Sequence, residues 1–406
     1  MTNPTDQPLL MVLGIRPDVI RASLMLKGLR EALGDRFKFV WSGQHYSDNL
    51  KDVFFRQLDV TPPDIELPVD LSNDTNFIGS WVSSLGALME ETNPAACVFL
   101  GDTNTVLGTT ACASYNVPVV HIEGCMRSYD WRMPEEKYRT VADHLSDLIY
   151  AYLDEYKNQG LLEGLDPRRI MVTGNPIVDV LEQYFISGQI RMPEEERDSL
   201  FTSVGADVDQ FCVMTSHRRE NVETEKSLRN IMQLAGSTGT PVVFPASYRT
   251  QKSLQRIGVD VPSNVRMIDP IGYAELLELM DSAAAVLTDS GTVVEETAVI
   301  GVPSIQMRSS TERPQVYDCG SSVKFDPHAE HDEASRDAVI SEAFSRSGSD
   351  WNHGLGDGRA SEKIVADLVA RMGDPESFRG HDPVGTNRPY DRNWGTGNSE
   401  LGSAGR

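Results

Sequence analysis

The sequence predicts an α/β protein built from two Rossmann-like domains, each with a parallel sheet covered by helices. Short apolar runs alternate with amphipathic segments along the chain, which is typical of parallel sheets with helices on both faces. A polar, weakly patterned stretch near residues 180–210 interrupts the alternation, which then starts again. A chain of 406 residues is also long enough for two domains of ordinary size.

The elements predicted before the polar stretch are strands and helices in regular alternation. Apolar runs bounded by turn residues predict strands at residues 9–14, 37–41, 95–100, 117–122, 149–152 and 170–172. Apolar residues at helical spacing predict helices at residues 14–33, 76–91, 106–115 and 135–148.

The same pattern continues after the polar stretch. It predicts strands at residues 211–215, 242–244, 265–268, 285–287 and 302–307, and helices at 224–237 and 272–282. We therefore expect a first domain over residues 1–185 and a second over residues 186–358. A last helix is predicted at 359–372. Residues 373–406 are rich in Gly, Pro, Asn and Arg without apolar periodicity, and we expect a disordered tail there.

Composition and charge exclude several classes of function. A net charge of −23 argues against nucleic acid as a partner, because phosphate binding requires a basic field. No apolar run is long enough to span a bilayer, and the N-terminus lacks a basic leader, so we expect a cytoplasmic protein without membrane association. The five cysteines are scattered without zinc-ligand spacing, which predicts reduced thiols and no metal site.

Residues 117–139 are the stretch in which the chemistry is most concentrated. An apolar strand ends in a segment that carries four acidic residues, three arginines and a histidine. Chemistry in α/β proteins is placed just beyond the carboxyl ends of strands, and Glu123 and Arg127 follow this strand closely. A solvated loop would explain the charges but not their closeness to a buried strand. We therefore interpret the stretch as part of a site.

A second candidate is TDSGTVVEE, residues 288–296, which predicts an anion site. Ser290, Gly291 and Thr292 would begin a helix, where free backbone N–H groups and the helix dipole favour a negative group. An ordinary N-cap is the alternative. Glu296 lies one turn deeper, where its carboxylate would accept hydrogen bonds from ribose hydroxyls.

Other loops after predicted strands carry further candidates for anion binding and proton transfer. Arg16 and Arg313 each lie beside a proline, and His217 follows a strand. Arginine is suited to bidentate phosphate contact. For proton transfer the candidates are Asp102, Glu123, Glu135 and His217, because carboxylates in one cleft drive their pKa values apart.

Purely structural roles remain open for several of these residues. Glu135 and Arg139 are four residues apart and would also form a simple ion pair on one helix face. Asp102 would also serve as a helix N-cap, and His121 is best explained as a hydrogen-bonded core histidine. Neither GxxxxGK[ST] nor GxGxxG after the first strand occurs, which argues against a P-loop kinase and against a nicotinamide cofactor.

Taken together, these motifs resemble the non-hydrolysing UDP-N-acetylglucosamine 2-epimerase family. The resemblance runs from about residue 10 to residue 323 and rests on GIRPDVIR, SGQHY, GDTNT, HIEGCMR, MPEEKYR, VTGNPIVDVL, SHRREN, TDSGTVVEE and TERP, in the family's order. It implies the glycosyltransferase-B-type architecture with an interdomain active-site cleft, in which the C-terminal helix rejoins the first domain. It also implies reversible conversion of UDP-GlcNAc to UDP-ManNAc through a 2-acetamidoglucal, without a metal or other cofactor.

The resemblance also implies roles for individual residues. Asp102, Glu123 and Glu135 correspond to the acid/base and sugar-binding carboxylates, and His217 to a catalytic group beside the leaving diphosphate. The remaining UDP-binding positions are Arg16, Arg21, Arg139, Ser290, Gly291, Thr292, Glu296 and Arg313. Arg21 stands where the family usually has lysine, and Thr292 where it has glycine. Ser247 replaces a histidine of the second, activating site of bacterial members, which makes allosteric activation doubtful.

Alternatives remain for the substrate and the reaction. Arg21, VFF at residues 53–55, GDTN and SGT also resemble a sister branch that acts on UDP-linked 6-deoxy-N-acetylhexosamines. A retaining glycosyltransferase of the same fold would also bind UDP against the second domain, but would not need the three carboxylates of the first. A hydrolysing epimerase and a catalytically silent nucleotide-sugar-binding protein are further alternatives. A homodimer is the expectation from base rates and from the family.

Overall fold

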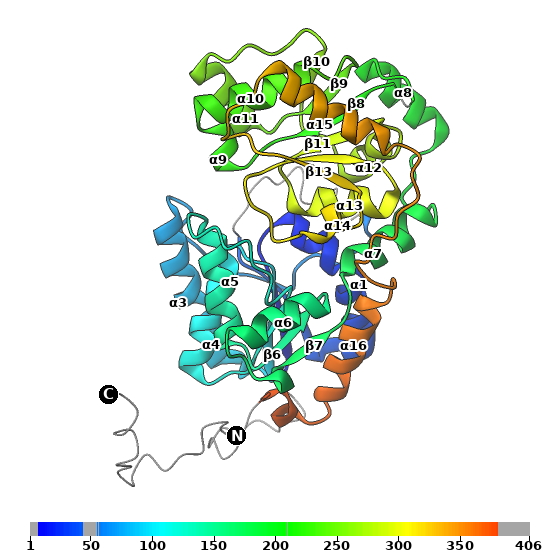
Figure 1. Cartoon of the computed structure of the whole chain (residues 1–406). Helices are drawn as coiled ribbons and strands as arrows, with labels where there is room; N and C mark the ends of the chain where they lie inside the picture. The colour runs from blue at the N-terminus through cyan, green and yellow to red at the C-terminus, as the bar shows by residue number, and fades with distance from the viewer. Residues whose placement is uncertain (1–6, 44–54, 56, 209, 381–406) are drawn as a thin grey trace, which may run out of the picture.

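A computed structural model gives the fold of the chain, shown in Figure 1, and describes residues 7–43, 55, 57–208 and 210–380. Two parallel sheets, one of seven strands and one of six, form the centres of two domains that stack on each other. The two-domain α/β prediction is therefore confirmed.

The first sheet has the strand order β3-β2-β1-β4-β5-β6-β7, with every pair parallel. Its strands are β1 (Leu9–Leu13), β2 (Phe37–Trp41), β3 (Ile65–Glu66), β4 (Ala96–Leu100), β5 (Val119–Ile122), β6 (Leu148–Ala151) and β7 (Ile170–Val172). All five residues of β1 are buried, because this central strand is covered on both faces.

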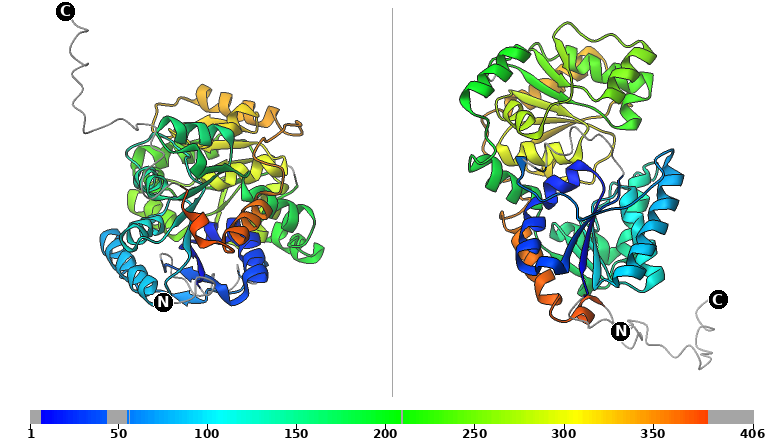
Figure 2. Two further views of the ribbon diagram at one scale, coloured as in Figure 1. Left: turned by 90° about the horizontal axis from the view of Figure 1, so that it is seen from below. Right: turned by 180° about the vertical axis from the view of Figure 1, so that it is seen from behind.

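Helices cover both faces of the first sheet, as the right-hand view of Figure 2 shows. One face packs on α1 (Arg16–Leu33) and the other on α3 (Asp74–Thr92). Successive residues of β1 alternate between the two cores: Leu9, Met11 and Leu13 belong to one, and Leu10 and Val12 to the other. The remaining helices of this domain are α4 (Thr109–Tyr115), α5 (Pro134–Leu145) and α6 (Asp154–Leu162).

The second sheet has the order β10-β9-β8-β11-β12-β13, again with all pairs parallel. Its strands are β8 (Cys212–Thr215), β9 (Val242–Pro245), β10 (Val265–Ile268), β11 (Ala285–Thr288), β12 (Ser304–Met307) and β13 (Ser322–Phe325). Its helices are α9 (Arg219–Val222), α10 (Glu225–Gly236), α11 (Tyr248–Ile257), α12 (Tyr273–Asp281), α13 (Gly291–Ile300), α14 (Gln315–Asp318) and α15 (Glu333–Ser345).

The polar stretch between the domains is more ordered than its sequence predicts. Helix α7 (Pro176–Val180) continues into a π-helical segment (Leu181–Ile186), and α8 (Glu194–Val204) follows. Phe201 of α8 is buried and its ring meets that of Phe211 edge-on, with centroids 5.9 Å apart. Helix α8 therefore belongs to the second domain. The apolar residues of α8 show little helical periodicity because only its last turn is buried.

The chain returns to the first domain at its end. Helix α16 (Ala360–Arg371) lies beside α1 in Figure 1, and Val365 packs over Gly28, where an added Cβ would lie 3.2 Å from Val365. A 3-10 helix (Pro375–Phe378) follows, with Phe378 fully buried. The disorder predicted from residue 373 therefore does not apply to residues 373–380, and residues 381–406 lie outside the described part of the chain.

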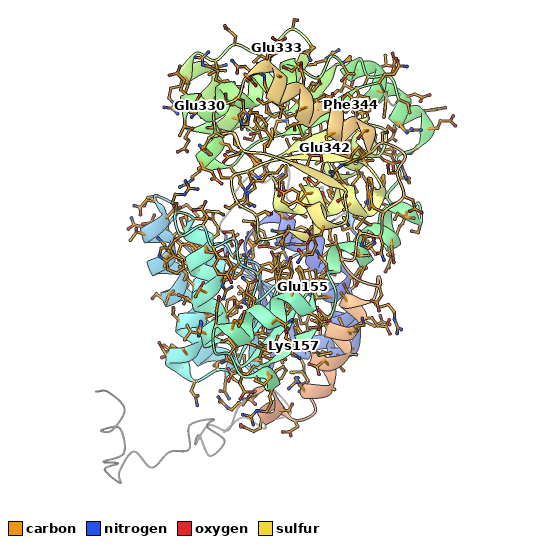
Figure 3. The ribbon with its side chains drawn as sticks, in the orientation of Figure 1. Glu155, Lys157, Glu330, Glu333, Glu342 and Phe344 are labelled. Carbon is orange, nitrogen blue, oxygen red and sulfur yellow. The ribbon has the colours of Figure 1, made fainter. Side chains whose placement is uncertain are left out.

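The surface carries many of the acidic residues. In Figure 3, Glu330 and Glu333 lie near the outer end of the second domain and Glu342 lies closer to the first domain; all three are exposed, as is Glu155 on the first domain. Across the described ranges, no helix combines the length and the apolar character that a membrane crossing requires.

Candidate active site

The candidate site is formed where the carboxyl ends of strands from the two sheets face each other, the usual location in open α/β sheets. The first domain contributes Asp102 after β4 and Glu123 after β5. The second contributes His217 after β8, Ser290 after β11 and Arg313 after β12. The two halves meet directly, because Arg313 donates a hydrogen bond to Glu123 across 3.0 Å.

Glu123 is the centre of the site. Its carboxylate is 1% exposed and forms ion pairs with Arg21 and with Arg313. Arg139 lies 3.6 Å from it, and the Tyr152 hydroxyl donates to it across 3.4 Å. A carboxylate buried this deeply is stable only because several cations and donors compensate the loss of water.

The backbone after β5 is strained, and it is held in place by a structural histidine and aspartate. Glu123 and Cys125 adopt positive φ angles of 74° and 66°, a region that non-glycine residues rarely occupy. Asp143 accepts a hydrogen bond from the Cys125 N–H across 3.0 Å and lies 2.8 Å from Nδ1 of His121. His121 Nε2 is 2.8 Å from the carbonyl oxygen of Gly101. His121 is therefore a hydrogen-bonded core histidine that links two site loops, which agrees with the structural role considered for it from the sequence.

Arg127, which the sequence placed beside Glu123, is directed away from it. Its guanidinium pairs with Asp143 across 2.7 Å and with Glu163 across 2.7 Å. These two ion pairs stabilise the loop after β5, and both lie within the first domain.

The other two carboxylates of the first domain have different environments. Asp102 pairs with Arg139, and its side chain is 23% exposed. Burial would raise the pKa of Asp102, but the charges of Arg139, Arg218 and Arg313 together hold the pKa below its usual value. Burial, together with the nearby Asp102 charge, raises the pKa of Glu135. Arg139 thus pairs with Asp102 and Glu123, and the simple helix-face pair with Glu135 is not formed. The pKa values of these two carboxyl groups are therefore shifted in opposite directions.

The start of α13 combines a helix cap with the arginine of the TERP loop. Ser290 is the N-cap residue, and its Oγ accepts from the Val293 N–H across 3.4 Å. A Cβ added to Gly291 would lie 2.5 Å from Nη1 of Arg313, so glycine is needed for this close approach. The N-cap alternative is thus correct, and a cation lies beside the same helix terminus.

The two glutamates of α13, Glu295 and Glu296, contact other side chains and do not complete a capping box. Glu295 pairs with Arg313 across 2.9 Å, and Glu296 accepts from the Tyr273 hydroxyl across 2.8 Å. Burial raises the pKa of Glu296 to about 7. Thr292 is half-buried in the first turn.

Several residues of the site were not singled out from the sequence. Glu312 pairs with Arg308 across 2.9 Å and with Arg313, and Arg218 lies 3.9 Å from it. Burial would raise the pKa of Glu312, but these arginines hold it well below its usual value. The sequence contained one indication of these residues. Arg218 and Glu312 are adjacent to the predicted site residues His217 and Arg313, in the motifs SHRREN and TERP.

Asp18 is a further unpredicted residue of the site. It is fully buried beside Arg21, whose Nη2 donates to it across 2.8 Å. Burial raises the pKa of Asp18 to about 6 despite this pairing. Arg21 therefore links Asp18 to Glu123. The arginine at this position, where lysine was expected, thus contacts two carboxylates.

Arg16 and Ser247 complete the predicted positions. Arg16 begins α1 and is half-buried, and burial lowers its pKa. Ser247 caps α11, with its Oγ accepting from the Thr250 N–H across 3.2 Å. Residues 44–46 and 53–54 of the SGQHY and VFF motifs lie outside the described residues.

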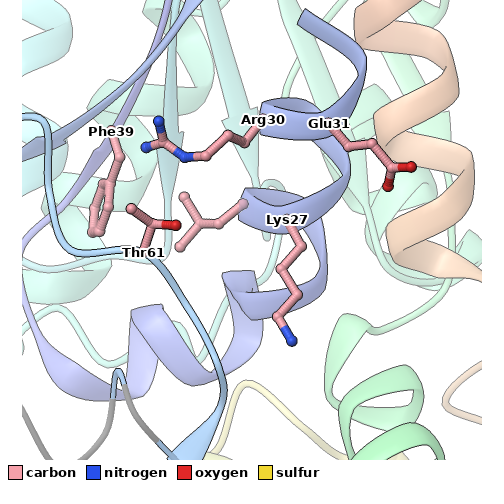
Figure 4. Close-up of a pocket in the computed structure, with 6 residues that line it drawn as sticks. Lys27, Arg30, Glu31, Phe39 and Thr61 are labelled. Atoms are coloured by element: carbon pink, nitrogen blue, oxygen red, sulfur yellow. The ribbon is translucent and has the colours of Figure 1, made fainter. Parts of the chain in front are cut away.

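Hollows elsewhere on the described surface do not coincide with this site. One of about 240 Å³ lies beside α1, lined by Leu26 and Phe39 among others; in Figure 4 the Arg30 side chain extends toward Phe39 and that of Lys27 points away from it. Arg30 already pairs with Asp64 across 2.7 Å. No cluster of three or more His, Cys, Asp or Glu side chains in the described ranges is arranged to hold a metal ion.

Comparison with known proteins gives a consistent result over most of the chain. The sequence profile of the family described as UDP-N-acetylglucosamine 2-epimerase matches residues 29–369. The UDP-N-acetylglucosamine 2-epimerase of Methanocaldococcus jannaschii is 31% identical over 368 residues, which cover 88% of this chain and 98% of that protein. The UDP-2,3-diacetamido-2,3-dideoxy-D-glucuronate 2-epimerase of Pseudomonas aeruginosa is 30% identical over 376 residues, covering 90% and 99%.

A solved structure agrees with the architecture. The M. jannaschii UDP-GlcNAc 2-epimerase, crystallised with UDP-GlcNAc and UDP, superposes with a TM-score of 0.81 at 29% identity. The alignment covers 90% of this chain and all of that one. The prediction of a glycosyltransferase-B-type arrangement of two Rossmann-like domains is confirmed.

Proposed function

This chain belongs to the UDP-N-acetylglucosamine 2-epimerase family, a family of isomerases, and we propose that it interconverts UDP-GlcNAc and UDP-ManNAc by inverting carbon 2 of the sugar. The observation that carries the proposal is the buried Glu123 of the first domain, which pairs with Arg313 of the second and lies 3.6 Å from Arg139, the partner of Asp102. This arrangement supports proton transfer next to a site for an anionic leaving group.

The residue types fit a two-step reaction. The proton on carbon 2 is not next to a carbonyl group, so direct removal is unfavourable. In the proposed route, a base takes this proton while UDP leaves carbon 1, which forms a 2-acetamidoglucal. UDP then returns to carbon 1 as a proton is delivered to the other face of carbon 2. The route is redox-neutral, so we propose no cofactor.

Two of the three carboxylates, those of Asp102 and Glu135, would supply the acid and the base. Arg139 and the neighbouring arginines lower the pKa of Asp102, whereas burial and the Asp102 charge raise the pKa of Glu135. Two carboxyl groups of one site with pKa values shifted in opposite directions suit a base on one face of the sugar and an acid on the other. Glu123 would orient the sugar between them.

The second domain would bind UDP. Ser290, Gly291 and Thr292 present the N-terminus of α13 to the diphosphate, and Arg313 lies against the same turn. Arg16, Arg21 and Arg139 approach from the first domain, and His217 from the loop after β8. Glu296 would accept from the ribose once its bond to Tyr273 is shared.

Two related UDP-sugars are alternative candidate substrates. The P. aeruginosa relative, at 30% identity, is named for a diacetamido-glucuronate. The motifs at Arg21 and Thr292 also match a branch that acts on 6-deoxy sugars. All three substrates would be inverted at the same carbon by the same carboxylates.

The test is incubation with UDP-GlcNAc in deuterium oxide, followed by proton NMR. We expect UDP-ManNAc to accumulate with deuterium at carbon 2. Free ManNAc and UDP would show a hydrolysing reaction instead. No change with UDP-GlcNAc, followed by turnover of a UDP-6-deoxy-N-acetylhexosamine or the diacetamido-glucuronate, would reassign the substrate. No turnover of any of them would overturn the proposal in favour of a glycosyltransferase or a binding protein.

A further inference from the structure

We propose that Asp289 is a positioning residue of this site, because its buried carboxylate fixes the loop after β8 and thereby orients His217 and Arg218 toward the diphosphate. Asp289 itself is 0% exposed, so it acts through these two residues and not by touching the ligand. The inference rests on the proposed function in that it takes UDP as the ligand.

Asp289 is bonded almost entirely to one neighbouring loop. Its carboxylate accepts from the Ser216 hydroxyl across 3.0 Å and from the backbone N–H groups of His217 and Arg218, each across 3.1 Å. Asn221 Nδ2 donates to the same oxygen across 3.1 Å. A single carboxylate therefore holds both ends of residues 216–221 against the end of β11.

The contacts also orient the side chains of His217 and Arg218. Nδ1 of His217 lies 3.5 Å from Oδ1 of Asp289, which leaves Nε2 as the nitrogen available to a ligand. His217 is 54% exposed and borders open space. Arg218 donates from Nε to the backbone oxygen of Asp289 across 3.0 Å, so its guanidinium is anchored at one edge.

The same junction connects the loop after β12. Asn221 Nδ2 also donates to the Met307 carbonyl across 2.9 Å, just before the segment that carries Arg313. On the other side, the Thr250 hydroxyl of α11 donates to the Ser216 carbonyl across 2.7 Å. The loops after three strands and the start of α11 thus form one rigid unit around Asp289.

Such rigidity has a chemical purpose in the proposed reaction. Negative charge develops on the diphosphate as it leaves the sugar, and donors already fixed in position stabilise that charge without reorganising. A carboxylate that only stabilised the fold would have the same hydrogen bonds, but its removal would weaken UDP binding equally whether or not His217 is present. That difference makes the proposal testable.

The experiment is a double-mutant cycle in the full-length protein with Asp289→Asn, His217→Gln and both together. The readouts are the UDP dissociation constant from calorimetry and the melting temperature, with epimerisation rates measured in parallel. We expect Asp289→Asn to weaken UDP binding ~10-fold or more in the wild-type background and less than ~3-fold in the His217→Gln background, the usual range for coupled neighbours. Asp147→Asn is the control, because Asp147 is also buried and accepts from the Val119 N–H, but at the far end of β5.

Equal losses of UDP affinity in both backgrounds would overturn the proposal and leave Asp289 a structural residue. If Asp289→Asn does not fold, the cycle is repeated with Asn221→Ser, which removes one donor to Asp289, and the same coupling with His217→Gln is expected. Because UDP binding is measured without turnover, a protein that epimerises none of the candidate UDP-sugars would overturn the proposed function and leave this test intact.

Discussion

Arg313 of the second domain and Glu123 of the first form a hydrogen-bonded ion pair of 3.0 Å, and their side chains are only 4% and 1% exposed. The two residues are 190 positions apart in the chain. The pair therefore connects the domains at the point where their strand ends meet. Arg313 also pairs with Glu295 and Glu312, so one guanidinium compensates three buried carboxylates.

Replacing Arg313 by Ala should destabilise the protein strongly and abolish tight UDP binding. Removing one partner of a buried pair leaves uncompensated charge, at a cost of about 3–5 kcal/mol. Urea unfolding measures the first effect and calorimetry with UDP the second. Arg229→Ala is the control, since its pair with Glu225 is on the surface and contributes about 0.5 kcal/mol. Similar losses of stability in the two variants would contradict the ion-pair account.

Glu135→Gln should slow epimerisation ~100-fold or more while leaving UDP affinity and melting temperature nearly unchanged. Glu135 lies near Asp102 and is proposed to transfer a proton, and loss of such a group has this usual cost. Its neighbour Glu136 provides a matched comparison, because it accepts from the Tyr129 N–H across 2.8 Å and from Ser128. Glu136→Gln should lower the melting temperature. Wild-type turnover in Glu135→Gln would remove Glu135 from the mechanism.

Gly291→Ala should weaken UDP binding ~10-fold or more without unfolding the protein. The new Cβ would lie 2.5 Å from Nη1 of Arg313, so the guanidinium must move away from the start of α13. Gly79→Ala serves as the control. A Cβ there meets nothing within 4 Å in the middle of α3, and a gain of up to about 1 kcal/mol is expected. Unchanged UDP affinity in Gly291→Ala would show that Arg313 does not contribute from this position.

Much of the fold was predictable because the sheets are parallel and buried. Strands β2, β7 and β10 were predicted to the residue, since each is a short run bounded by turn residues. Strand β13 was missed because Lys324 interrupts its apolar residues, and β3 because it has only two residues. Helix α8 was taken for part of a linker because few of its residues are buried.

The site residues that directly follow predicted strands could be predicted, whereas those defined by contacts between segments far apart in the chain could not. Asp102, Glu123 and His217 each come directly after an apolar run, which local sequence reveals. The pairing of Arg313 with Glu123 and the bonds of Asp289 to residues 216–221 join distant segments, and no local pattern specifies them. The interpretation of Arg127 as a site residue failed for the same reason, because its partners Asp143 and Glu163 are determined by packing.

Glu296 provides a prediction for the pH dependence of stability. It is 2% exposed, bonded to Tyr273, and burial raises its pKa from 4.5 to about 7. Between these two values the folded state binds the proton and the unfolded state does not. The stability that this protonated group contributes is therefore complete below pH 4.5 and is lost as the pH rises through 7.

Glu296→Gln should accordingly gain stability relative to the wild type as the pH rises from 5 to 8. A pKa raised from 4.5 to about 7 corresponds to ~3 kcal/mol between the two ends of this window, and glutamine keeps a partner for Tyr273 without carrying a charge. Urea unfolding of both proteins at pH 5, 6, 7 and 8 measures the difference. The exposed Glu333→Gln, in which the same charge is removed from the start of α15, shows what charge removal alone contributes. A stability difference between Glu296→Gln and the wild type that stays constant over this range would mean that Glu296 is ionised in the folded protein throughout, held by Arg21 or another cation of the site.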